Sequence, residues 1–333
     1  MSRNQTTIIK GVAILLMLFL HLFNSGNLTS QCHPLLFVGE TPLVTLLTRA
    51  CNPIPFFIIL SGYGLSHAFQ QERLSLRRQA VKLLRLYAYY WLVLAVFVPI
   101  GTLINPAKYP GTMQNVALNL TAWTPTYNRE CWFLFPYAVL CLTSPLLLRL
   151  FERIGIAWSL GLTFFVTMSG NYVMSRYIAP NLLYDTPLAH LLNYLGFIFS
   201  FAIGAAFHRL SQQHPLRIKA IEGRNLCVAL LLALLIGLRC LFATGAFHAF
   251  YAAAFILLFL HFDLPKAHCR FFQTMGKHSM GMWMTHTFFC YYLFSPFIYG
   301  FRYPLVIYAV LIIVSYACSV VLDFVAKKVH IIR

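Results

Sequence analysis

The stretch IIKGVAILLMLFLHLF, from Ile8 to Phe23, decides how the rest of this sequence is interpreted. It is an apolar helix of about the length that crosses a bilayer, yet it contains Lys10 and His21. At about 100° and 1.5 Å per residue, a separation of eleven positions puts both side chains on one face, roughly 16 Å apart along the axis. Ionisable groups inside a membrane are unfavourable unless they face a cavity or a partner. The face that Lys10 and His21 share is therefore predicted to belong to a functional site.

Apolar residues dominate the whole chain. Of its 333 residues, 59% are hydrophobic and 10% are charged, and apolar runs of membrane-spanning length recur from end to end. This composition excludes a soluble globular protein. We predict an all-α polytopic membrane protein that folds as a single integral-membrane domain over residues 1–333.

The apolar runs predict about ten transmembrane helices. They cover about 6–24, 48–70, 86–105, 130–148, 154–174, 188–207, 225–242, 246–262, 275–295 and 304–325. Pro53 and Pro55 should break or kink the second helix, which a membrane tolerates only beside protein or water. Residues 106–129 form the longest predicted outer loop, and its position favours a role in the choice of acceptor.

Basic residues are concentrated in alternate connections between these helices. The net charge is +17, and Lys and Arg cluster in 71–85, 149–153, 208–224 and 266–270 and in the C-terminal tail. Such connections stay on the cytoplasmic side of a membrane, so both termini are predicted to be cytoplasmic. Because the charge follows this alternation instead of forming one basic surface, no nucleic-acid partner is expected.

The polar face of the first helix has two interpretations. Lys10 could extend to the membrane surface while His21 bonds to a neighbouring helix. Alternatively, Lys10 binds the phosphates of a thioester donor such as acyl-CoA at the cytoplasmic mouth, and His21 meets the thioester about 16 Å deeper. In the second helix, Ser61 and Tyr63 add hydroxyl groups beside Gly62, either in a passage or in a packing notch.

Two later segments also combine polar and apolar residues. In the run Arg129–Leu134, Glu130 could cap the helix start, or orient a substrate hydroxyl or His21. Trp132 suits an interfacial belt or stacking on a sugar. In the ninth predicted helix, Ser279 and His286 are seven positions apart and share one face, and His286 needs a polar partner at that depth.

Other common chemistries lack their signatures. The nine cysteines are scattered without a CxxC pair or a metal-ligand spacing, so no metal site is predicted. The sequence also has no HExxH, GxSxG, Walker or Rossmann pattern.

Several motifs, in order along nearly the whole chain, resemble those of the membrane acyltransferase family 3 proteins. They are Lys10–x10–His21, Phe56–Tyr63 (FFIILSGY), the basic run ending at Arg85, Trp132–Leu134 (WFL), and Gly276–x–x–Ser279 followed by His286. One departure is that Lys10 replaces the arginine typical of the family, which keeps the charge but loses the bidentate guanidinium.

The resemblance implies transfer of an acyl group, usually acetyl, from cytoplasmic acetyl-CoA or another acyl-CoA to a hydroxyl of a surface polysaccharide or lipid-linked sugar. It implies that His21 is a general base or a transient acyl carrier and that Glu130 positions His21 or the sugar. Lys10 and Arg85 would bind the CoA phosphates. The residues implied along the passage are Ser61, Tyr63, Trp132, Ser279 and His286. The expected location is the inner (plasma) membrane, among membrane lipids, with a homodimer as one arrangement.

The alternative is a transporter or flippase for a lipid-linked saccharide. Ten spans, a polar interior and a broken second helix would also suit transport. Against it, the sequence has no paired repeats, and Asp323 is the one convincing acid within a predicted span.

Overall fold

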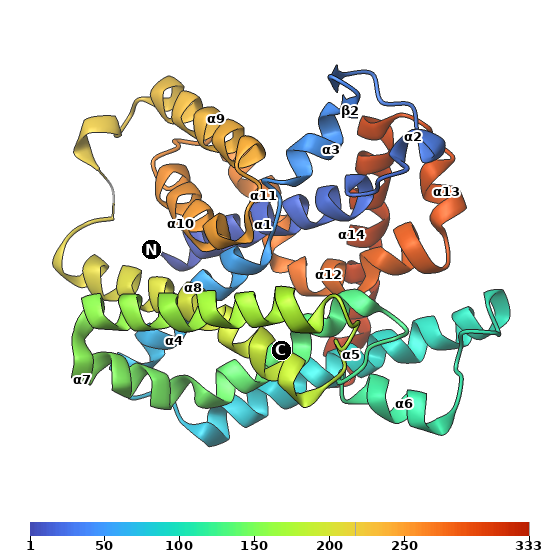
Figure 1. Ribbon diagram of the computed structural model, residues 1–333, viewed down its shortest axis with the longest axis horizontal. Helices are drawn as coiled ribbons and strands as arrows, with labels where there is room; N and C mark the ends of the chain where they lie inside the picture. The colour runs from blue at the N-terminus through green and yellow to red at the C-terminus, as the bar shows by residue number, and fades with distance from the viewer. Residues whose placement is uncertain (217, 333) are drawn as a thin grey trace. The chain divides into compact units, whose positions relative to one another are not determined.

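In the computed structural model, residues 1–216 and 218–332 are described, and their regular structure is almost entirely helical (Figure 1). The one exception among them is an antiparallel pair of two-residue strands, β1 (Phe37–Val38) and β2 (Thr41–Pro42). The predicted all-α fold is therefore confirmed. The chain divides into two compact units, one of Met1–Phe56, Leu92–Tyr109 and Arg217–Arg333, the other of Phe57–Trp91 and Pro110–Leu216.

Five helical segments of the described chain are long and apolar enough to cross a membrane. They are α1 (Arg3–Phe23), α5 (Leu76–Ile104), the segment Arg129–Ile178, α8 (Pro187–Gln213) and α14 (Pro304–Lys328). Shorter apolar helices are α9 (Asn225–Leu241) and the segment Gly245–Phe259, which contains η4 (Gly245–Phe247) and α10 (His248–Phe259). The protein is thus a multi-pass membrane protein, while ten spans, a single domain and cytoplasmic termini stay predictions.

The first unit is built around α1. Its start is fixed by a capping box, in which the Ser2 side chain accepts from the Gln5 N–H and the Gln5 side chain accepts from the Ser2 N–H. The other elements of this unit are α2 (Leu28–Gln31), α3 (Leu43–Thr48), η3 (Lys219–Ile221), α11 (Lys266–Lys277), α12 (Ser279–Thr287), η5 (Phe288–Tyr292) and α13 (Ser295–Tyr299), together with β1, β2, the second half of α5, α9, η4, α10 and α14.

Two glycines bring the backbones of α1 and α11 together. A Cβ added to Gly11 would overlap the carbonyl oxygen of Phe272, and one added to Gly276 would overlap the carbonyl oxygen of Thr7. Only glycine permits so close an approach. The two helices run in the same direction, because Cys269, which precedes Gly276, lines one pocket with Gln5 and Ile8, which precede Gly11. The side of α1 that faces the unit interior continues through Ile14, Leu18 and Leu22, which are fully buried.

The second unit contains most of α4 (Ile54–Gln70), the first half of α5, α6 (Met113–Leu120), η1 (Arg129–Phe133), α7 (Leu134–Val173), the π-helical η2 (Met174–Ile178) and α8. Here Gly62 and Gly204 permit a close approach of α4 and α8. A Cβ on Gly62 would overlap the Phe201 carbonyl, and one on Gly204 would overlap the Ile59 carbonyl. Within α7, Gly155 has a φ of 81° and separates two helical parts, as the predicted helices 130–148 and 154–174 require.

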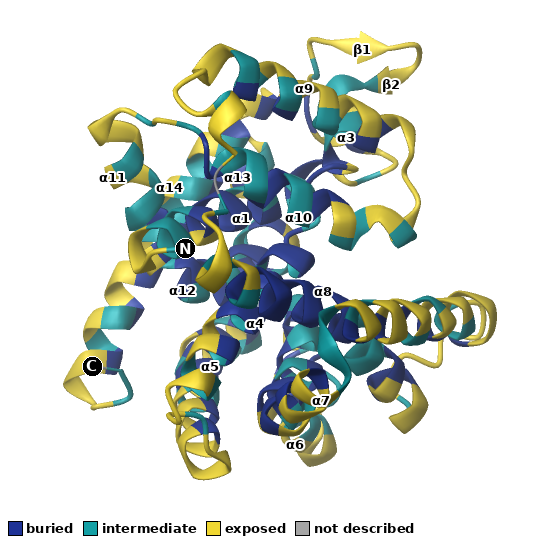
Figure 2. Ribbon diagram, turned by 90° about the vertical axis from the view of Figure 1, so that its left-hand side faces the viewer, coloured by how far each residue is buried: buried dark blue, intermediate teal, exposed yellow. Residues whose placement is uncertain are grey.

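Apolar side chains are exposed along several helices, as expected for surfaces that face lipid. Figure 2 shows exposed residues along α9, where Leu226, Leu230 and Leu234 follow one another at four-residue intervals with exposures of 75%, 62% and 57%. Side chains four positions apart share one face of a helix. An apolar stripe of this length would be unfavourable in water but not in a bilayer.

Several predicted boundaries were wrong. The helix predicted over 86–105 begins at Leu76, because the Ser75 hydroxyl caps the Arg78 N–H and the basic residues that follow favour a helix. The predicted outer loop 106–129 contains α6, whose start is capped by Thr112.

The second and ninth predicted helices are each interrupted. Within the predicted helix 48–70, residues 49–53 are not helical and include Pro53, and α4 begins after them at Ile54, so the expected interruption is confirmed. The predicted helix 275–295 is wrong as a single element. It is divided at His278, whose φ and ψ of −94° and 4° are not helical, and it ends in the π-helical η5.

Candidate functional site

Two histidines from different helices lie side by side in the first unit. The ring centroids of His21 on α1 and His286 on α12 are 5.1 Å apart, with the rings tilted by 50°. Each histidine is ten residues after the glycine of the close contact, Gly11 or Gly276, about 15 Å along its helix. The two helices run in the same direction, so the glycine contact places the histidines at the same level.

His286 is held in one tautomeric form by its own helix. Its ring is fully buried, and Nδ1 lies 3.1 Å from the carbonyl oxygen of Met282 and 2.8 Å from that of Trp283. Because carbonyl oxygens only accept, Nδ1 carries the hydrogen and Nε2 has a free lone pair. Among the described residues, Nε2 is buried and has no hydrogen-bond partner.

Tyr291 on η5 contacts His21 in two ways. Its hydroxyl donates to the backbone carbonyl of His21 and lies 3.4 Å from His21 Nδ1. Since the single hydroxyl hydrogen is directed to the carbonyl, the tyrosine oxygen accepts from Nδ1–H, which leaves His21 Nε2 as the basic nitrogen.

Further tyrosines fix the second half of α1. Tyr308 on α14 donates to the Leu15 carbonyl at 2.9 Å, and Tyr299 on α13 donates to the Leu22 carbonyl at 3.0 Å. In the same unit, the ring of Phe97 stacks on Phe288 of η5 at 4.3 Å. The helix segment that carries His21 is therefore held from several sides.

Lys10 and Ser279 lie toward the other end of the same helices. Lys10 is exposed on α1, next to the glycine contact. Ser279 is buried, and its hydroxyl donates to the Gly276 carbonyl at 3.0 Å. That bond caps the end of α11 at its junction with α12, and a place for Ser279 along a passage stays a prediction.

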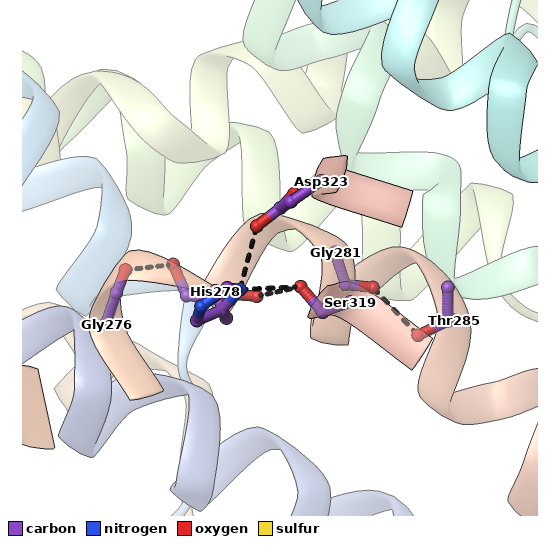
Figure 3. A network of polar contacts seen from close by, with 7 residues as sticks. Gly276, His278, Gly281, Thr285, Ser319 and Asp323 are labelled. Carbon is purple, nitrogen blue, oxygen red and sulfur yellow. Dashed lines mark hydrogen bonds and ion pairs between the residues drawn. The ribbon is translucent and has the colours of Figure 1, made fainter. Parts of the chain in front are cut away.

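A second polar network lies at this junction (Figure 3). His278 Nδ1 lies 2.7 Å from a carboxylate oxygen of Asp323 on α14, and the Ser319 hydroxyl is 3.2 Å from the His278 carbonyl. Both partners of the ion pair are mostly buried, with exposures of 21% and 17%. The network ties the break between α11 and α12 to α14, so Asp323 is paired rather than isolated.

In the second unit, the predicted hydroxyl residues of α4 have partners. Ser61 bonds to the Tyr137 hydroxyl at 3.1 Å and Tyr63 to the Ser211 hydroxyl at 3.2 Å. Arg85 is exposed on α5.

The segment before α7 places Glu130 and Trp132 on η1. The Asn128 side chain accepts from the Glu130 N–H at 3.2 Å, so Asn128 is the cap of this helix. Glu130 is half-buried, and Trp132 packs beside Phe197 with centroids 6.0 Å apart.

Tyr291 and His278 have no role among the predictions from the sequence. The pair Tyr291-Tyr292 is a weak signal in a chain with 18 tyrosines. Tyr291 is five residues after His286, which in a regular α-helix lies on a different face. The i→i+5 hydrogen bonding of η5 widens the turn and brings it back toward His21.

One comparison with known proteins identifies the chain. No curated protein and no solved structure matches it. A family model described as an acyltransferase domain matches residues 5–324, which include His21, His286 and every other predicted site residue. The chain therefore belongs to acyltransferase family 3.

Proposed function

We propose that this protein transfers an acyl group, with acetyl as the expected one, from cytoplasmic acyl-CoA to a hydroxyl of a surface polysaccharide or lipid-linked sugar. Acyl transfer follows from the family, whereas the donor and the acceptor belong to the proposal. The observation that carries it is His21, a histidine in a membrane-spanning helix whose tautomer and backbone are held by Tyr291.

His21 acts as the general base in this proposal. Its Nε2 takes the proton from the acceptor hydroxyl while the oxygen attacks the thioester carbonyl. The new C–O bond forms, the C–S bond breaks, and the proton ends on the CoA thiolate. A transient acyl group on His21 is the other route for the same nitrogen.

The remaining predicted residues bind the two substrates. Lys10 and Arg85, both exposed, attract the phosphates of the acyl-CoA. About 16 Å along α1 separates Lys10 from His21, a length that the flexible arm of CoA can cover. Glu130 and Trp132 are assigned to the acceptor sugar, and Ser61, Tyr63 and His286 to the lining of the passage. No metal takes part in this reaction.

The test is release of free CoA by purified protein in detergent, with a glycan-containing membrane extract as acceptor. His21→Ala should lower the rate at least 100-fold, because a positioned base contributes about 10²–10⁴-fold. His33→Ala, an exposed histidine outside the site, is the control that should keep the wild-type rate. Activity of His21→Ala within a few fold of wild type would remove His21 from the reaction. No release and no CoA binding by the wild type would favour transport.

A further inference from the structure

The Nε2 atom of His286 is one of four buried side-chain polar atoms of the first unit that have no hydrogen-bond partner among the described residues. It is buried, it is an acceptor, and no described residue donates to it. Buried polar atoms in proteins are nearly always hydrogen-bonded, so such an exception needs an explanation. The neighbour that can supply a donor is the ring of His21, 5.1 Å away between centroids.

We infer that His286 is a positioning residue that stabilises the protonated form of His21. When His21 takes the proton of the acceptor hydroxyl, its imidazolium gains a second N–H group, and a small rotation of the ring brings one N–H to His286 Nε2. This inference rests on the proposed role of His21 as base. It assigns His286 a part in the reaction beyond lining a passage.

The physical basis is that the hydrogen bond exists only once charge has formed. In the resting enzyme Nε2 has no donor, so substrate binding gains nothing from it. In the transition state the same atom accepts a bond from a cation in a buried site, where such bonds are strong. An interaction made only in the transition state raises kcat and leaves KM unchanged.

The surroundings of His286 are compatible with a single positive charge on the pair of histidines. Two imidazoles at this distance in a buried site cannot both be charged, and the backbone carbonyls of Met282 and Trp283 keep the hydrogen of His286 on Nδ1. The other titratable groups nearby are Tyr291 on η5 and Cys318 on α14, which bonds to Thr285. Among the described residues, no carboxylate forms an ion pair with His286.

The test compares His286→Phe with His286→Gln. Phenylalanine keeps a ring but has no acceptor, whereas the glutamine side-chain oxygen can reach the position of Nε2. His286→Phe should lower kcat roughly 10- to 100-fold with an unchanged KM for acyl-CoA. Without the acceptor, protonated His21 is less stable, so the acid limb of the kcat/KM profile should move to lower pH. His286→Gln should recover most of kcat and the position of that limb.

His190→Phe is the matched control. His190 is also buried, but it packs between Trp123 and Phe135 in the second unit. This variant should leave the acid limb where it is, whatever it does to stability.

Two results would overturn the inference. One is a His286→Phe enzyme with wild-type kcat. The other is a loss of kcat in both His286 variants with an unmoved acid limb, which indicates packing alone. Either result leaves the base role intact if His21→Ala is still inactive, whereas an active His21→Ala removes the proposed function itself.

Discussion

Lys10 lies on the face of α1 that it shares with His21, eleven residues before the histidine. Lys10→Ala should raise the KM for acyl-CoA roughly tenfold with little change in kcat, because one charge-assisted bond to phosphate is lost far from the reacting atoms. Lys10→Arg should keep or lower the KM, since a guanidinium binds phosphate with two hydrogen bonds. The measurement is initial-rate kinetics at varied acyl-CoA.

Lys277 gives a matched control for this experiment. It is also exposed and directly follows Gly276, the glycine opposite Gly11. An equal rise in KM for Lys277→Ala would show that general positive charge attracts the donor. An unchanged KM for Lys10→Ala would remove Lys10 from the donor site.

At the residue scale, the sequence indicated which side chains need explanation but not which of them meet. His21 and His286 each stood out as an imidazole in an apolar helix, and each was expected to need a polar partner. That they face one another depends on the contact between α1 and α11, which pairs residues 265 positions apart. Sequence periodicity describes one helix at a time, so it cannot provide this register.

At the scale of elements, the glycine contact sets the spacing and register of α1 and α11. Gly11→Ala and Gly276→Ala should each destabilise the protein by about 1–3 kcal/mol, because the added Cβ overlaps a backbone carbonyl that cannot rotate away. Both should also lower activity, since separating these helices changes the distance between His21 and His286. Thermal unfolding in detergent and CoA release are the two measurements.

Gly237→Ala on α9 is the control for both glycine variants. A Cβ at Gly237 meets no atom within 4 Å, so alanine there should be neutral or stabilising by up to about 1 kcal/mol. If Gly11→Ala and Gly276→Ala behave like Gly237→Ala in both measurements, the close contact does not determine the site.

The element boundaries show where local patterns succeed and fail. The end of α1, both ends of α9 and the start of α14 agree with the apolar runs to within one residue, because these helices stand out in the sequence by their hydrophobicity. The apolar pattern does not predict the early start of α5, because a basic segment between apolar runs favours a loop, although here it lies on a capped helix. The division at His278 was missed because the ion pair with Asp323 on α14 is a tertiary contact.

At the scale of the whole molecule, the distribution of Lys and Arg is the main evidence for orientation. Five helical segments long enough to cross a membrane are present in the described chain, but helix length does not say which side a connection faces. The basic connections supply that direction, because moving them across the membrane is unfavourable. Orientation is therefore a prediction from charge, and it can be tested separately from the chemistry.

Single cysteines in four connections should report their side of the membrane. Met113→Cys and Ala243→Cys lie in predicted outer connections, and Gln71→Cys and Ala267→Cys lie in predicted inner ones. Each unit therefore carries one outer and one inner position. All four positions are exposed, whereas the nine native cysteines are buried or half-buried and should give a low background. In right-side-out vesicles an impermeant maleimide should label the first two variants, and the other two only after permeabilisation. Labelling of Gln71→Cys or Ala267→Cys in sealed vesicles would reverse the predicted orientation. Lys10 would then lie at the outer side of the membrane, away from the cytoplasmic acyl-CoA.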